Sequence, residues 1–222
     1  MSIWAEVGEI YSTTLSNDAW MMSQAYRTSG AWVVGSIATF LGGMIIYGIY
    51  RAVPFVERHF ERTVMVWSYL AIAAIIFVEV FRRFVLNQQA PWSTTLPPFL
   101  FLIMTWFGCS YNVRLRTHLA FSEFRMNMPR NGQMLCLTLD AVLWFVFCVI
   151  VVVTSTRVAV NSAANFQILL GTDNVLQWWF LATVPLAFIM MAGRVIENYA
   201  DDLSRYRGGR PLVEQAVIGG DA

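Results

Sequence analysis

The feature that constrains this chain most is an uncharged, apolar run at residues 96–113. A helix rises ~1.5 Å per residue, so a run of this length comes close to crossing the ~30 Å hydrocarbon core of a bilayer. The residues before it, 87–95, are polar and turn-prone. Among them, Pro91 and Trp92 suit a bend at the membrane surface, because an indole ring can keep one edge in water. The stretch therefore predicts a membrane-spanning helix that follows an interfacial turn.

The composition of the whole chain supports the same class. Of its 222 residues, 57% are hydrophobic and 13% are charged, whereas soluble domains carry roughly 25% charged residues. We predict an all-α integral membrane protein of about five transmembrane helices, with a surface amphipathic helix after the third. The membrane domain is predicted at 31–199, between an N-terminal interfacial arm at 1–30 and a cytoplasmic tail at 200–222. The predicted spans are residues 31–53, 63–86, 96–113, 134–156 and 175–194.

The charged and reactive residues give no sign of catalysis. The formal net charge of +1 argues against a strongly basic, nucleic-acid-binding surface. Both histidines lie outside the spans, without Cys, Asp or Glu at metal-ligand spacing, and there is no P-loop or G-x-S-x-G motif. We therefore expect a chain that is not an enzyme and has no catalytic, cofactor or metal site. The three cysteines are interpreted as small buried hydrophobic residues: Cys109, Cys136 and Cys148.

Small residues recur every four positions in the first span. We call this set the small-residue ridge; its members are Ala31, Gly35, Thr39 and Gly43. Such a ridge allows another helix to approach closely within lipid, although small residues are also simply common in membrane helices. Whether this span crosses the membrane fully or lies against the others stays open. The arm before it is interpreted either as an amphipathic helix on the membrane surface or as a frayed terminus.

Two carboxylates lie inside predicted spans, where an ionisable residue is a functional candidate. Glu79 precedes Arg82 and Arg83 by three and four residues, so on a helix it can pair with either. A structural ion pair near the end of the span and a role in transport are both open for it. Asp140 lies near the start of the fourth span, where it can reach a neighbouring helix, accept a hydrogen bond from Thr138 or extend toward water.

Cations follow the third span. Arg114 and Arg116 end it, with His118 beyond, as expected of basic residues near a cytoplasmic membrane face. Residues 115–128 then place apolar side chains on one helical face, which predicts the surface helix. The segments between spans alternate in arginine content, with 4 arginines on one side and 11 on the other. The positive-inside rule therefore predicts a periplasmic amino end and a cytoplasmic carboxyl end.

Several of these residues occur in an order typical of one transporter family. They are Arg83-Phe84, Pro91-Trp92, Trp106-Phe107-Gly108, Arg114, His118-Leu119, and a later run of Pro185-Leu186-Ala187-Phe188 with Gly193-Arg194. In this order the chain resembles the small membrane subunit of tripartite ATP-independent periplasmic (TRAP) transporters, the DctQ type. The resemblance covers roughly residues 63–203. The chain departs from the family at residues 93–95, which are Ser-Thr-Thr where carboxylates often follow the proline-tryptophan pair, so no role of those acids carries over.

The resemblance implies an accessory scaffold subunit of a secondary transporter in the bacterial inner membrane. The expected partners are the lipid bilayer, a large TRAP permease subunit that carries the substrate and sodium sites, and a periplasmic solute-binding protein that delivers the solute. The complex would import a small, carboxylate-bearing solute by sodium symport. The alternative function is a membrane anchor subunit of a membrane-bound enzyme complex. The candidate structural or interface residues are Glu79, Arg83, Pro91, Trp92, Trp106, Gly108, Arg114, Arg116, His118 and Asp140.

Overall fold

The computed structural model describes residues 2–116, 125 and 127–212. In this part of the chain the regular elements are helices, with one isolated antiparallel bridge between Ile168 and Leu176. Five helical segments are long and apolar enough to cross a membrane, so the chain is an all-α membrane protein, as predicted. Most of the predicted surface helix at 115–128 lies outside the described residues. The elements are α1 (Ile3–Ser16), α2 (Ala19–Ala25), α3 (Gly30–Ala52), α4 (Pro54–Val85), η1 (Pro91–Thr94), α5 (Leu96–Leu115), α7 (Arg130–Ala164), α8 (Trp178–Leu181) and α9 (Thr183–Arg207).

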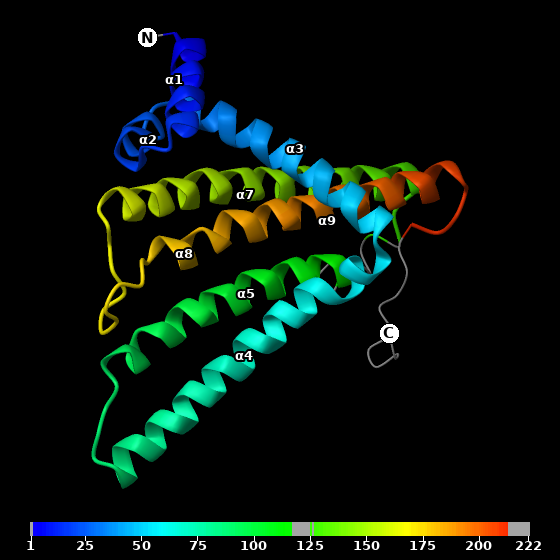
Figure 1. Cartoon of the computed structure of the whole chain (residues 1–222). Helices are drawn as coiled ribbons and strands as arrows, with labels where there is room; N and C mark the ends of the chain where they lie inside the picture. The colour runs from blue at the N-terminus through cyan, green and yellow to red at the C-terminus, as the bar shows by residue number, and fades with distance from the viewer. Residues whose placement is uncertain (1, 117–124, 126, 213–222) are drawn as a thin grey trace.

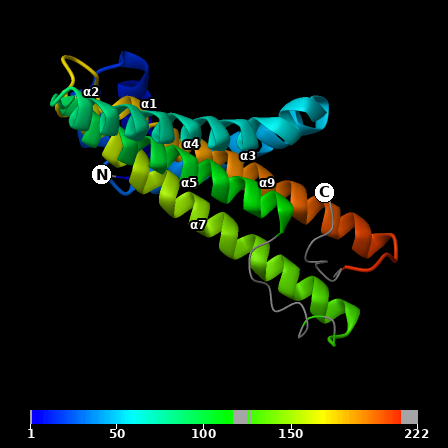
Figure 2. The same ribbon diagram turned by 90° about the horizontal axis from the view of Figure 1, so that it is seen from below.

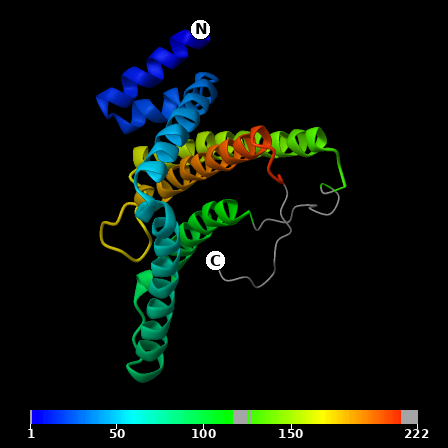
Figure 3. The same ribbon diagram turned by 90° about the vertical axis from the view of Figure 1, so that its right-hand side faces the viewer.

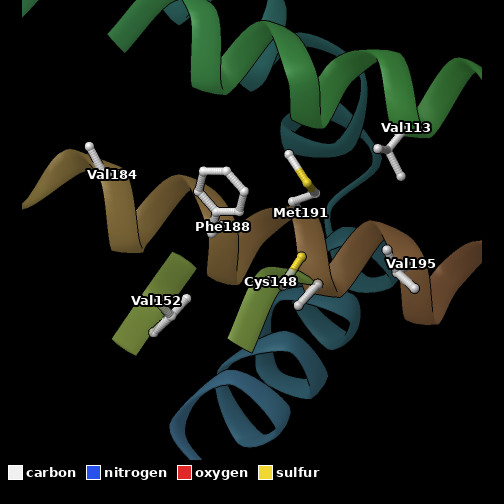
Figure 4. Close-up of a cluster of buried hydrophobic side chains, with 8 residues drawn as sticks. Val113, Cys148, Val152, Val184, Phe188, Met191 and Val195 are labelled. Atoms are coloured by element: carbon white, nitrogen blue, oxygen red, sulfur yellow. The ribbon is translucent and has the colours of Figure 1, made fainter. Parts of the chain in front are cut away.

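The central helix is α9. Half of its apolar stretch is buried, against 17% in α3, α5 and α7 and 6% in α4. It runs beside α7 in Figure 1, and α5 lies between α4 and α7 when the molecule is seen from below (Figure 2). Phe188 and Met191 of α9 meet Val113 of α5 and Cys148 and Val152 of α7 in the main hydrophobic cluster (Figure 4). The fold is therefore built around α9, and α4 is the least buried span.

The small-residue ridge of α3 is buried within this chain. All four of its residues are buried. A Cβ on Gly35 would lie 2.2 Å from Cγ2 of Val153 in α7, and one on Gly43 would lie 3.3 Å from the backbone nitrogen of Gly193 in α9. A Cβ at Gly35 would force Val153 to move, and one at Gly43 would make a tight contact with α9, so small residues suit both positions. The prediction that the ridge packs against another helix is confirmed.

The arm is helical rather than frayed. Figure 3 shows α1 and α2 beside the first turns of α3. Ile10 of α1 is 1% exposed, and the Glu6 carboxylate accepts hydrogen bonds from the Ser29 hydroxyl (2.7 Å) and the Gly30 N–H (2.8 Å) at the start of α3. These bonds, the first above all, hold the pKa of the Glu6 carboxyl below its usual 4.5. Contact between α1 and the membrane surface stays a prediction.

Three helices extend beyond the predicted spans. Helix α4 begins at Pro54, since proline is well tolerated at the first helical position. Residues 51–62 lie outside the predicted spans and are expected to form a loop or helix end in water, but Glu61 among them is 2% exposed. Helix α7 continues to Ala164, beyond the predicted end of its span at residue 156, and α9 continues to Arg207 into the predicted tail. Hydropathy locates apolar stretches, whereas helices also continue through polar residues beyond them.

Candidate functional site

A buried ion pair joins α4 to α9 across 133 positions of sequence. Nε of Arg194 lies 3.1 Å from Oε1 of Glu61, and Nη2 lies 3.0 Å from Oε2. The side chains of Arg194 and Glu61 are 0% and 1% exposed. Such a two-point pair matches the planar guanidinium to the carboxylate and fixes their relative orientation. Glu61 lies about two turns into α4, so the pair lies near the junction of α3 and α4. We call the end of the bundle where these two helices meet the charged end (Figure 1).

Neighbouring groups supply further hydrogen bonds to both members of this pair. Oε1 of Glu61 also accepts from the Tyr50 hydroxyl of α3 (3.0 Å) and the Ser110 hydroxyl of α5 (2.7 Å). Arg194 donates through Nη2 to the Glu57 carbonyl (2.6 Å) and lies 3.7 Å from the centre of the Tyr50 ring. Burying a charge is costly unless it is paired and hydrogen-bonded, and both charges here are. The result is a polar junction between α3, α4, α5 and α9.

Further charged side chains lie around this junction. Glu197 accepts from Nη1 of Arg194 at 2.7 Å. The Glu57 carboxylate lies 3.9 Å from Nη1 of Arg194 and 2.8 Å from Nη2 of Arg114. Arg114 also donates to the Arg58 carbonyl of α4 (3.3 Å). The structure therefore brings the predicted candidate Arg114 into this network, where it ties the end of α5 to the start of α4.

Arg116 ties the end of α5 to α9. Its guanidinium pairs with Asp202 (2.6 Å) and donates to the Asn198 carbonyl (2.9 Å). In return, the Asn198 amide donates to the Val113 carbonyl at the end of α5 (2.8 Å). Arg116 has φ of 54°, a left-handed conformation that ends the helix. His118, the third predicted cation of this group, lies outside the described residues.

The predicted Pro91 and Trp92 turn lies at the opposite end of the bundle. It forms the short helix η1 between α4 and α5. Glu79 lies beside it and accepts hydrogen bonds from the Ala90 N–H (3.3 and 3.4 Å), so the hydrogen-bond donor to its carboxylate here is a backbone group. Arg83 donates instead to the Gln89 side chain (3.3 Å). A cleft of about 190 Å³ borders Glu79 and is lined by Ala74, Ile75, Val78, Arg82, Trp92 and Ser93.

The remaining candidates contribute to packing and to one partly exposed ion pair. Trp106 contacts Phe188, with 4.9 Å between ring centres. A Cβ on Gly108 would lie 3.3 Å from the sulfur of Met65, so this glycine permits the close contact of α5 with α4. Asp140 pairs with Arg125, whereas the Thr138 hydroxyl donates to its own helix.

Sequence reasoning missed the centre of the network. The predicted spans leave Glu61 just before the second span and take Arg194 only as the end of the last one. One signal for Glu61 was present: Pro54 is a helix-start residue, and a helix from there puts Glu57 and Glu61 on one face. Sequence spacing carries no signal that this face meets Arg194, because that contact depends on how α4 and α9 pack.

Comparison with known proteins adds the family. In the described part of the chain, no group of three or more His, Cys, Asp or Glu side chains is placed to hold a metal ion. A comparison with curated proteins finds no match. The family model described as "Tripartite ATP-independent periplasmic transporters, DctQ component" matches residues 72–205, more than half of the chain. The chain therefore belongs to the DctQ family, the small permease component of TRAP transporters.

Proposed function

We propose that this chain is a static frame subunit for the large permease subunit of a TRAP-type secondary transporter in the bacterial inner membrane. A periplasmic solute-binding protein delivers the solute, and the large subunit carries the substrate and sodium sites. The solute is a small, carboxylate-bearing molecule imported with sodium. In this proposal the amino end lies in the periplasm and the carboxyl end in the cytoplasm, an orientation supported by the distribution of arginines between the spans. Membership of a transporter family lends no support to the alternative of an enzyme anchor.

The observation that carries this proposal is that the buried charged groups, Glu61 and Arg194, already have ion-pair and hydrogen-bond partners within the chain. A site for sodium or for a substrate carboxylate needs polar groups that are free to bind it. Glu61 and Arg194 instead use their hydrogen-bonding groups on each other and on Tyr50, Ser110 and Glu57. Among the described residues, the one buried side-chain polar atom without a hydrogen-bond partner is Oγ of Ser162, on α7. These contacts suit a rigid junction between helices.

Close backbone packing supports the same role. A Cβ on Gly193 of α9 would lie 3.2 Å from the Gly43 carbonyl oxygen of α3, and a Cβ on Gly42 would lie 2.6 Å from the Ile189 side chain. Helices packed this closely resist sliding past one another. A tightly packed interface can switch between a few distinct packings, but it does not deform continuously. The chain thus has the properties of a frame against which another subunit moves.

The test separates a structural ion pair from a transport site. Arg194→Met leaves the Glu61 charge buried without its partner, which should cost about 3–5 kcal/mol and lower the yield of complex with the large subunit. The double variant Glu61→Gln/Arg194→Met removes both charges and should recover much of that yield. Arg125→Met, which breaks a partly exposed pair with Asp140, is the control and should change the yield little.

Solute uptake is then measured in reconstituted vesicles and normalised to the amount of assembled complex. This measurement distinguishes a structural ion pair from a transport site. Under this proposal the double variant keeps both the rate per complex and the sodium dependence. Loss of sodium dependence in a fully assembled double variant would show that the pair belongs to the coupling machinery and that the frame role is wrong.

A further inference from the structure

The first turns of α4 separate charges that are mixed in the sequence. Residues 57–62 read Glu-Arg-His-Phe-Glu-Arg. In the structure the two acids face the bundle, where Glu61 pairs with Arg194 and Glu57 with Arg114. A helix that points its acids inward must point the intervening bases elsewhere, since residues three or four apart share a face.

The bases form an exposed surface on the other side of α4. Arg58, His59 and Arg62 are all exposed, and we call them the outer basic face. Among the described residues, no carboxylate forms an ion pair with any of the three, because the nearby acids of α4 are engaged inside. Within the described part of the chain, the outer basic face therefore carries positive charge that no carboxylate pairs, at the charged end of the bundle.

Apolar side chains flank this face along the same side of the helix. Phe55 is 72% exposed and stacks on the His59 ring, with 4.8 Å between ring centres. One and two turns further along, Val66 and Tyr69 are 40% and 60% exposed and begin the apolar stretch of α4. Cations at the edge of an exposed apolar helix surface fit the boundary between lipid headgroups and acyl chains.

We propose that the outer basic face binds the phosphate of an anionic phospholipid. Arg58 and Arg62 supply planar guanidinium groups, which suit phosphate oxygens, and the apolar surface beyond them receives the acyl chains. Two observations favour a lipid over an acidic protein segment: α4 is the least buried span, and its basic residues run directly into exposed apolar ones. This site is separate from the frame role and does not depend on the orientation of the chain.

The test measures binding of phosphatidylglycerol to the purified full chain by native mass spectrometry, with phosphatidylcholine as the uncharged reference. Arg58→Gln/Arg62→Gln should lower the phosphatidylglycerol affinity about thirtyfold, since each arginine near an anionic headgroup contributes about fivefold. Phosphatidylcholine binding should not change. Arg58→Lys/Arg62→Lys keeps the charge and should retain most of the affinity. Inorganic phosphate should not displace the lipid, because it gains nothing from the apolar surface.

The matched control is Arg82→Gln/Arg83→Gln, which removes the same charge from the other end of the same helix. If both double variants lose the lipid equally, binding follows net charge alone and the proposal is overturned. It also fails if the Arg58→Gln/Arg62→Gln variant keeps its phosphatidylglycerol affinity. Loss of co-purification with the large permease subunit in that case would identify the face as a protein interface instead.

Discussion

Gly171 lies so close to Pro91 that a Cβ on the glycine would come within 2.4 Å of the proline carbonyl carbon. Gly171 also has φ of 80°, a conformation that glycine adopts at no steric cost. Next to it, the Thr95 hydroxyl donates to the Leu170 carbonyl (2.6 Å). The loop between α7 and α8 is therefore fixed directly on the turn between α4 and α5, so both connections at this end act as one unit.

The first prediction concerns this contact. Gly171→Ala should destabilise the chain by about 2 kcal/mol or more, because the left-handed conformation costs ~1–2 kcal/mol for a residue with a Cβ and the backbone of Pro91 must also move. Thermal unfolding of the purified chain in detergent measures the effect. The control is Gly8→Ala, at a helical position with open space around it, which should be neutral or stabilising. Equal stability of the two variants would contradict the packing of Gly171 on the turn.

The burial of the small-residue ridge could be predicted from the sequence, whereas the buried ion pair could not. A repeat of small residues every four positions marks a helix face by itself, so the burial of Gly35 and Gly43 could be predicted without knowing their partners. The contact of Glu61 with Arg194 could not, because it requires the starting point of α4 and the way in which two distant helices pack. Counting charges along the sequence does not reveal this contact either. Glu61 lies between Arg58 and Arg62, whose side chains point to the other side of α4.

The second prediction concerns the ridge itself. Gly35→Leu should lower the stability of the chain by about 1–3 kcal/mol, because the added side chain overlaps Val153 of α7 and forces the helices apart. The control is Gly48→Leu, on the same helix but with no atom near its Cβ position. Thermal unfolding and the yield of complex with the large subunit are the measurements. If the Gly35→Leu chain were as stable as the control, the close contact between α3 and α7 would contribute little to the stability of the fold.

The third prediction is a pH dependence at the arm. The folded-state pKa of Glu6 lies below the usual 4.5, mainly because Ser29 donates to its carboxylate. Its contribution to stability is therefore fully present above about pH 4.5 and is lost as the pH falls through the lower, folded-state pKa. Wild type should be more stable than Glu6→Gln at neutral pH, and the difference should vanish at low pH. The control Glu9→Gln removes an exposed acid from the same helix and should change the stability little at neutral pH.

The fourth prediction tests the orientation. After removal of the three native cysteines, Leu170→Cys should react with an impermeant thiol reagent from the periplasmic side and Asn127→Cys only after the membrane is opened. Leu170 is 77% exposed and suits this purpose, whereas Ser162, near the end of α7, is 1% exposed and does not. Labelling of residue 127 from the outside would contradict a cytoplasmic charged end.

The last prediction separates a structural role from selectivity at the end of α5. Arg114→Ala breaks the pair with Glu57, and Arg116→Ala breaks the pair with Asp202, so both should lower the yield of assembled complex. Arg116→Gly loses the same pair but keeps a residue suited to φ of 54°, so it should be about 1 kcal/mol more stable than Arg116→Ala. Solute uptake, normalised to assembled complex, should keep the same solute preference in all three variants, because under the proposed function selectivity lies on the partner chains. A changed preference with full assembly would instead mean that the end of α5 contributes directly to the transport site.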